Sequence, residues 1–195
     1  MSDYPEIFVM RHGQTEWNRA GRHQGQLDSP LTELGIEQAA IQGRLLHDAV
    51  GHRDDVDALT SPQGRASHTA KIALADLGID ARPDPRLMEI GFGQWQGLTF
   101  DEMARGWPEH TKNADTEPFA WHFQAPGGES FDAICDRAMA VLNSLAGPTI
   151  LVTHGVTSRI LRGLWLGLDM DGMQALPGGQ GCVYHLSDGD QRTLG

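Results

Sequence analysis

Short apolar runs alternate with longer amphipathic segments along this chain. The apolar runs cover residues 6–10, 56–60, 149–153 and 183–186, and each has the length of one strand. Apolar residues at helical spacing predict helices that begin after Thr32 (with Leu34, Ile41 and Leu45 on its apolar face), at Ser61-Pro62, after Ser130 and after His154. This alternation is typical of a layered α/β fold.

Residues 81–128 break the pattern. They hold five prolines, many glycines and seven aromatic residues, which are Phe92, Trp95, Phe100, Trp107, Phe119, Trp121 and Phe123. The stretch is short and weakly periodic, so we interpret it as a small irregular lid, an excursion within one domain of residues 1–195. The fold expected is therefore a three-layer α/β sandwich with a mostly parallel central sheet, helices on both faces and this lid.

Composition narrows the classes of function. No segment approaches the roughly 18 consecutive apolar residues of a membrane span, and residues 7–10 with their acidic flanks do not form a signal peptide. Cys135 and Cys182 are isolated, which favours a reducing compartment, and we expect the cytoplasm. A net charge of −11 argues against a nucleic-acid or membrane partner. An anionic substrate would need arginines gathered locally.

Three predicted strands end in basic or imidazole side chains. Arg11-His12-Gly13 follows the first strand, His154-Gly155 follows the third, and Arg65 lies just beyond the second. Ligands of parallel α/β sheets bind beyond the carboxyl ends of the strands, so these side chains should meet at one place. We expect free backbone amides after Gly155 to add a dipole suited to an anion.

This set of residues favours a phosphate site. Arginine presents a planar fork that matches two phosphate oxygens, and a neutral imidazole can act as a nucleophile near neutral pH. A second histidine can stabilise charge on the transferring oxygens. Each residue alone has an ordinary structural explanation, and only their joint occurrence at three strand ends argues for a site. The remaining histidines, at positions 23, 47, 52, 68, 110, 122 and 185, are interpreted as structural or solvent-exposed.

The order of motifs resembles the histidine phosphatase superfamily, which includes the cofactor-dependent phosphoglycerate mutases. The resemblance rests on residues 11–18, 24–25, 28–32, 61–70, 87–95, 126–130 and 152–155. It implies that His12 is the phosphorylated nucleophile and Glu89 the general acid and base. It also implies that Arg11, Arg65 and His154 complete the phosphate pocket, that Asn18 contacts the substrate phosphate, and that Gln24 and Gly25 line the mouth. Gly155 is a further expected substrate-binding residue.

Two positions depart from that pattern. Gln96 stands where many members have glutamate, which predicts fewer carboxylates near the mouth. Residues 178–182 lack the expected asparagine or serine, so no site residue is assigned there. We expect the apolar neighbours of Glu89 (Ile90, Phe92 and Trp95) to favour its protonated form by desolvation, which an acid catalyst requires.

The expected function is a phosphomonoester hydrolase acting on a small phosphorylated metabolite without cofactor or metal. A phosphoglycerate mutase is the alternative, but the stretch between Glu89 and Glu129 holds only Arg105 and Lys112 as basic residues, which suits a broad or apolar leaving group better than a second phosphate. A non-catalytic phospho-ligand binding module is a weaker alternative. A metallohydrolase is disfavoured because the chain has no His-Glu-x-x-His or His-x-His motif. Neither the substrate nor the oligomeric state follows from the sequence.

Overall fold

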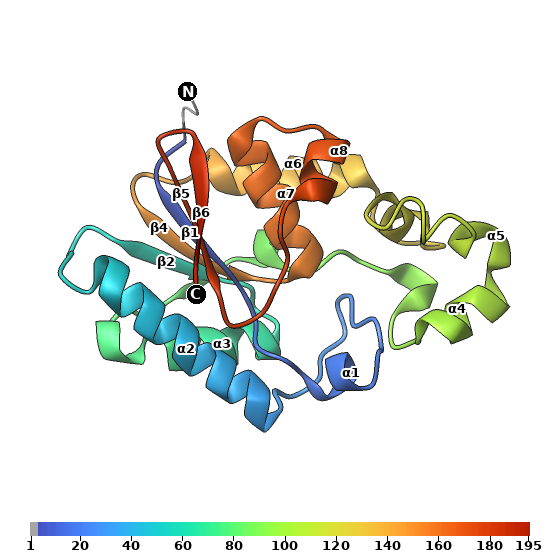
Figure 1. The fold of residues 1–195 in the computed structure, drawn as a ribbon, viewed down its shortest axis with the longest axis horizontal. Helices are drawn as coiled ribbons and strands as arrows, with labels where there is room; N and C mark the ends of the chain where they lie inside the picture. Colours follow the sequence, from blue (N-terminus) through green and yellow to red (C-terminus); the bar gives the residue numbers. More distant parts are fainter. Residues whose placement is uncertain (1–3) are drawn as a thin grey trace.

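A computed structural model describes residues 4–195, and its centre is a six-stranded sheet of order β3-β2-β4-β1-β5-β6 (Figure 1). The strands are β1 (Ile7–Arg11), β2 (Asp57–Thr60), β3 (Arg82–Pro83), β4 (Thr149–Thr153), β5 (Val183–Ser187) and β6 (Asp190–Leu194). Strands β1 to β4 are mutually parallel, whereas β5 pairs antiparallel with β1 and β6 pairs antiparallel with β5. The mostly parallel sheet is thus confirmed. Strands β3 and β6 were not predicted, because β3 has two residues and β6 is polar and partly exposed.

Helices cover both faces of the sheet, as the three-layer prediction requires. Helices α2 (Glu33–Val50) and α3 (Gly64–Ala73) pack together on one face, and α6 (Phe131–Leu142) and α7 (Gly155–Leu166) on the other. The alternation of strand side chains explains the two layers of core. Ile7 and Val9 of β1 join one apolar cluster, and Phe8 and Met10 join the other.

Hydroxyl caps fix where the predicted helices begin. The side chain of Thr32 accepts a hydrogen bond from the Gly35 amide at the start of α2, and Ser130 does the same for Ala133 in α6. Both helix starts therefore agree with the sequence prediction.

The predicted apolar face of α2 is wrong. Leu34 and Ile41 are exposed, and the buried residues of α2 are Gly35, Ala39, Gln42, Leu46 and Val50. Small residues explain the difference, because they let α2 approach its neighbours more closely than leucine would. A Cβ at Gly43, for example, would lie 2.8 Å from the carbonyl oxygen of Ala73 in α3.

Residues 81–128 contain short elements around an aromatic cluster. After β3 come the 3₁₀ turns η2 (Pro85–Leu87) and η3 (Gly93–Trp95), the helices α4 (Phe100–Gly106) and α5 (Pro108–Thr111), and η4 (Ala120–Gln124). Helices α4 and α5 extend away from the sheet (Figure 1). Trp95, Phe119 and Trp121 are buried and belong to the same apolar cluster as α6 and α7. Two short helices complete the chain, α1 (Glu16–Arg19) and α8 (Met170–Ala175).

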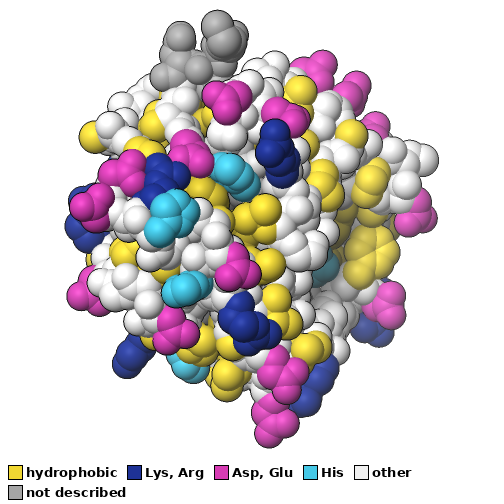
Figure 2. Space-filling model, turned by 60° about the vertical axis from the view of Figure 1, so that its left-hand side comes forward, with side chains coloured by type: hydrophobic (Ala, Val, Ile, Leu, Met, Phe, Trp, Pro, Cys, Tyr) yellow, Lys and Arg dark blue, Asp and Glu magenta, His cyan; other side chains and the backbone are white. Residues whose placement is uncertain are grey.

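Charged side chains of both signs are interspersed on the face shown in Figure 2, and neither sign gathers into one large patch there. In residues 4–195, no helix combines the length and apolarity that a membrane crossing would need.

Candidate active site

Strand register places His12 beside His154. Arg11 of β1 pairs with Thr153 of β4, and the His12 amide donates to the Thr153 carbonyl oxygen at 3.0 Å. The next residue on each parallel strand therefore emerges at the same edge of the sheet. The two imidazoles meet edge to face with ring centroids 5.1 Å apart. This convergence was predicted from the strand ends.

Two hydrogen bonds define the tautomer of His12. Its Nδ1 lies 2.7 Å from the carbonyl oxygen of Gly13, which can only accept, so Nδ1 carries the proton. The Nε of Arg65 can only donate, and it lies 3.2 Å from Nε2 of His12. Burial, reinforced by the charges of Arg11 and Arg65, lowers the pKa of His12 well below its ordinary value. His12 is therefore neutral at pH 7, with its lone pair on Nε2.

Arg65 is rigidly held in α3. Its Nη1 donates to the Leu27 carbonyl oxygen at 2.6 Å and to Asp28 at 3.0 Å, and its Nη2 donates to the Gly25 carbonyl oxygen at 2.8 Å. These bonds account for the burial of a charged side chain, because its N–H groups find acceptors on Leu27, Asp28 and Gly25 in place of water. They also aim Nε at His12.

His154 is buried and Arg11 is half-buried, and each has a side-chain nitrogen without a hydrogen-bond partner in residues 4–195. Nε of Arg11 and Nδ1 of His154 have no hydrogen-bond partner among the described residues. Nε2 of His154 lies 2.8 Å from the Ser61 hydroxyl, and burial, with the nearby charges, lowers the pKa of His154 well below its ordinary value. Since buried polar groups are normally paired, the free Nε of Arg11, which lines the cavity, indicates a place for a polar ligand.

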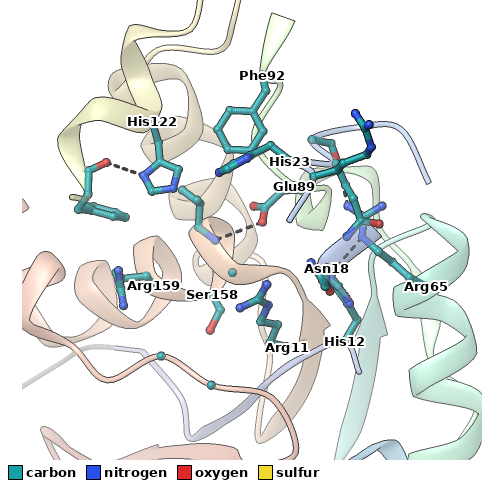
Figure 3. Close-up of a pocket in the computed structure, with 18 of the residues that line it drawn as sticks. Arg11, His12, Asn18, His23, Arg65, Glu89, Phe92, His122, Ser158 and Arg159 are labelled. Carbon is teal, nitrogen blue, oxygen red and sulfur yellow. Dashed lines mark hydrogen bonds between the residues drawn. The ribbon is translucent and has the colours of Figure 1, made fainter. Parts of the chain in front are cut away.

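Glu89 sits at the amino end of α7 in a polar environment. Its Oε1 accepts from the Ile90 amide and from the amide and hydroxyl of Thr157, and its Oε2 accepts from the Val156 amide at 3.2 Å. The expectation of an apolar environment for this carboxyl was therefore wrong. So was the expectation of free amides after Gly155, because the Val156 and Thr157 amides bind Glu89. Figure 3 shows Glu89 above Arg11, between two sides of the cavity.

The remaining predicted residues also line the cavity. Asn18 receives hydrogen bonds on Oδ1 from the Thr15 amide (3.2 Å) and from Gln180 Nε2 (3.3 Å), which leaves its Nδ2 available to a ligand. Gln24 is buried with Oε1 unpartnered. Gly25 adopts a positive φ of 52°, which glycine accepts readily. A Cβ at Gly155 would lie 3.4 Å from Cζ of Arg11.

The cavity has a volume of about 330 Å³ and extends beyond the predicted residues. Its predicted lining residues are Arg11, His12, Asn18, Gln24, Gly25, Arg65, Glu89 and Gly155. His154 does not line it but packs behind His12 with no exposed surface. The sequence did not predict the lining contributed by His23, Phe92, Phe119, His122, Ser158, Arg159, Arg162 and Tyr184.

Two residues were interpreted incorrectly from the sequence. His23 and His122 were left structural or exposed, yet both line the cavity, where burial lowers the pKa of His23 and lowers that of His122 to about 4. No motif marks either of them. His23 is next to Gln24 in the sequence, and His122 lies within residues 81–128. Closeness in sequence does not predict where a side chain points, so it could not place either imidazole in the cavity.

Positions that depart from the family pattern have support roles. Gln180, within the segment given no site residue, donates from Nε2 to the His12 carbonyl oxygen at 2.9 Å as well as to Asn18. Gln96 does not line the cavity, and its Oε1 accepts from the Gln26 amide at 2.7 Å. Gln96 therefore holds the loop that carries Gln24 and Gly25. Among the described residues, no group of three or more His, Cys, Asp or Glu side chains is placed to hold a metal ion.

Comparisons with known proteins identify the family of this chain. The model of the histidine phosphatase superfamily (branch 1) matches residues 7–194. A probable phosphoglycerate mutase of Photorhabdus laumondii is 34% identical over 169 residues, which cover 84% of this chain and 75% of that protein.

Solved structures resemble the whole chain. The α-ribazole phosphatase of Shigella flexneri superposes with a TM-score of 0.80 at 27% identity, over 97% of this chain and 95% of that one. A mycobacterial glucosyl-3-phosphoglycerate phosphatase, in complex with VO₃, superposes with a TM-score of 0.79 at 30% identity, over 97% and 96% of the two chains.

Proposed function

The chain belongs to the histidine phosphatase superfamily, and from that premise we propose that it is a phosphomonoester hydrolase acting on a small phosphorylated metabolite through a phosphohistidine on His12. The observation that carries the proposal is the neutral imidazole of His12, whose Nε2 lone pair is bracketed by Arg11 and Arg65 at the wall of the cavity. A buried nucleophile between two guanidinium groups suits a phosphate dianion.

In the first half-reaction the lone pair of His12 Nε2 attacks phosphorus, and the P–O bond to the leaving group breaks. Arg11 and Arg65 stabilise the equatorial oxygens, His154 supports His12 from behind, and the phosphate takes over the hydrogen bond that Arg65 Nε gives to His12. Glu89 donates a proton to the departing alkoxide. Its Oε2 has a single hydrogen bond, so this oxygen has room for a proton that faces the substrate.

In the second half-reaction the carboxylate of Glu89 accepts a proton from water as the water oxygen attacks phosphorus. The P–N bond breaks and its electron pair returns to Nε2. Inorganic phosphate leaves, and Glu89 regains the proton it gave up in the first step. The sum is ester plus water giving alcohol plus phosphate, with the protein unchanged.

The cavity wall supports hydrolysis over mutase activity. Between Glu89 and Glu129, the residues that reach the cavity are Phe92, Phe119 and His122. Arg105 bonds to a backbone oxygen of its own helix, and Lys112 pairs with Glu109 at the surface. The lid thus contributes no cation to hold a second phosphate. The likeness to a probable phosphoglycerate mutase keeps that activity as the second candidate.

The phosphohistidine is tested with His12→Asn. Mixing the wild type with a ³²P-labelled phosphomonoester and quenching in alkali should leave acid-labile label on the protein, and the variant should carry none and release no phosphate. The matched control is His68→Asn, because His68 is an exposed histidine of α3 outside the cavity. Full turnover by His12→Asn would refute the mechanism.

Mutase activity is distinguished from hydrolysis by its product and by its need for a bisphosphate primer. With 3-phosphoglycerate, a hydrolase releases phosphate whether or not 2,3-bisphosphoglycerate is added. Isomerisation to 2-phosphoglycerate that needs this primer and exceeds phosphate release would instead favour the mutase. We also propose a cytoplasmic location, which the free thiols of Cys135 and Cys182 support.

A further inference from the structure

The loop of residues 178–182 leads into β5 and is fastened to the end of β1. Nε2 of Gln42, a buried side chain of α2, donates to the carbonyl oxygens of Arg11 and Cys182 at 2.9 Å each. Gly181 adopts a positive φ of 78°, which glycine accepts readily, so the chain can turn there. The loop is therefore held beside the strand that leads to the proposed nucleophile.

The carbonyl group of His12 determines how the side-chain amide of Gln180 points. A carbonyl oxygen can only accept, and that of His12 lies 2.9 Å from Nε2 of Gln180, so the NH₂ group of Gln180 must face it. An amide nitrogen carries two hydrogens, and the second is directed at Oδ1 of Asn18, which lies 3.3 Å away. Gln180 therefore connects the backbone of the nucleophile to a side chain that is expected to contact the phosphate.

The side-chain amide of Asn18 is oriented in turn. Its Oδ1 faces two groups that can only donate, the Thr15 backbone amide at 3.2 Å and Nε2 of Gln180. Turning the Asn18 amide over would set Nδ2 against both donors and would lose both hydrogen bonds. Nδ2 is thus kept for the cavity, which Asn18 lines beside His12 (Figure 3).

The orientation of Asn18 matters because the oxygens of a phosphate dianion can only accept hydrogen bonds. Nδ2 of Asn18 would donate to such an oxygen, whereas Oδ1 in the same place would repel it. Resting on the proposed hydrolase and on the expected contact of Asn18 with the phosphate, we propose that Gln180 is a positioning residue that turns Nδ2 of Asn18 toward the phosphate. Gln180 is not among the described residues that line the cavity, so it acts through Asn18.

Gln180→Glu tests the proposal by reversing the polarity of this link. The carboxylate accepts where the amide donated, so Asn18 should turn over to donate to it and present Oδ1 to the phosphate. Calorimetry with inorganic phosphate should give a Kd about 10- to 100-fold higher than that of the wild type, the loss of one hydrogen bond to a charged group. Gln180→Met, which cannot donate, should raise the Kd by only about 3- to 10-fold, because the Thr15 amide still orients Asn18. Gln124→Glu, at an exposed position outside the cavity wall, is the control and should have no effect.

Asn18→Ala separates a positioning role from a structural one. In that background Gln180→Met should change the Kd of inorganic phosphate by less than about twofold, because no amide is left to orient. Equal factors with and without Asn18 would overturn the proposal, since Gln180 would then act through the His12 backbone alone. In NMR spectra, the side-chain NH₂ signal of Asn18 (identified by its loss in Asn18→Ala) should move when inorganic phosphate is added to the wild type but not to Gln180→Glu. An equal movement in both proteins would also overturn the proposal.

The role of Gln180 and the proposed function fail separately. Phosphate binding needs no turnover, so a wild type that hydrolyses no ester would refute the proposed function alone, and calorimetry would still decide the role of Gln180. With turnover, Gln180→Met should lower kcat/KM by the same factor for alkyl phosphates and for p-nitrophenyl phosphate, because Asn18 acts on the phosphate and not on the leaving group. A loss that depends on the leaving group would overturn the positioning role, even in an active enzyme.

Discussion

At the scale of single residues, a neutral imidazole beside two guanidinium groups dominates the electrostatics of the site. Desolvation and the charges of Arg11 and Arg65 both oppose protonation of His12. The hydrogen bond from Nδ1 to Gly13 then decides which nitrogen holds the lone pair. The arginines thus act twice in the proposed mechanism, because they keep the nucleophile neutral and attract the phosphate that it attacks.

Glu89→Gln tests the proposed acid and base. The amide keeps the shape of the side chain but cannot supply a proton to the leaving group or accept one from water. We expect turnover of alkyl phosphates to fall by about 10²- to 10⁴-fold. With p-nitrophenyl phosphate, whose phenolate leaves without help, stopped-flow should show a burst of nitrophenolate followed by slow turnover as phosphohistidine accumulates.

The dependence on leaving group is the informative result for Glu89. Gln96→Glu is a useful comparison, because this side chain holds the loop at the cavity mouth and does not line the cavity. It should not produce a burst. Equal losses for the alkyl and nitrophenyl esters in Glu89→Gln, with no burst, would show that Glu89 acts on the structure of the site instead of on proton transfer.

At the scale of elements, the nucleophile loop is pressed against the start of α2. A Cβ on Gly13 would overlap the carbonyl group of Gly35, and a Cβ on Gly35 would overlap the carbonyl oxygen of Gln14. The Gly13 amide also donates to the hydroxyl of Thr69 in α3 at 3.1 Å. Both helices of one layer therefore fix the backbone that carries His12.

Gly35→Ala should destabilise the protein by about 1–3 kcal/mol, because backbone on both sides must shift to admit the methyl group. Phosphatase activity should fall as well, since the shift moves the residues next to His12. Urea denaturation and kcat/KM measure the two effects. Gly106→Ala in α4 is the control: a Cβ there meets nothing within 4 Å, so stability should be unchanged or slightly higher. Equal stability of Gly35→Ala and the wild type would contradict the overlap.

The features predicted correctly from the sequence are those that a local pattern of residues determines. Strand ends and capping hydroxyls located β1, β4, α2 and α6, and with them the convergence of Arg11, His12 and Arg65. Prediction from the sequence fails where small residues set the packing: Leu34 and Ile41 form the more apolar stripe of α2, but Gly35 and Ala39 face inward. It also fails where tertiary folding brings distant segments together. Nothing local to His122 or Arg159 shows that the lid and the second turn of α7 meet across one cavity.

At the scale of the whole molecule, an acidic chain encloses a cationic cavity. The net charge is −11, yet five arginines and one glutamate line the cavity among the described residues. The protein avoids further positive charge there by keeping its buried histidines neutral. Burial lowers the pKa of each of four histidines in or behind the cavity wall, which are His12, His23, His122 and His154.

These neutral histidines make stability depend on pH. In the unfolded chain each imidazole binds a proton with a pKa of about 6.5, whereas in the folded protein the pKa is lower. Between the two values the unfolded state holds more protons, so the free energy of unfolding falls as pH falls. The stabilisation is complete above about pH 6.5 and is lost progressively below it, down to about pH 4 for His122. Glu6 and Asp84 have lowered pKa values, so the stabilisation that their ionised carboxylates give the folded protein is lost only at lower pH.

We therefore expect urea denaturation to show a steep loss of stability between pH 6.5 and pH 5, before most carboxylates titrate. Each histidine contributes a slope of up to about 1.4 kcal/mol per pH unit in this range. His122→Gln should reduce the slope by about that amount, because the amide can still donate to the Phe119 carbonyl oxygen but has no proton to gain. His68→Gln, at an exposed position of α3, should leave the slope unaltered. If stability were flat from pH 7 to 5, or if the His122→Gln slope matched the wild type, the neutral cavity histidines would be excluded as its source.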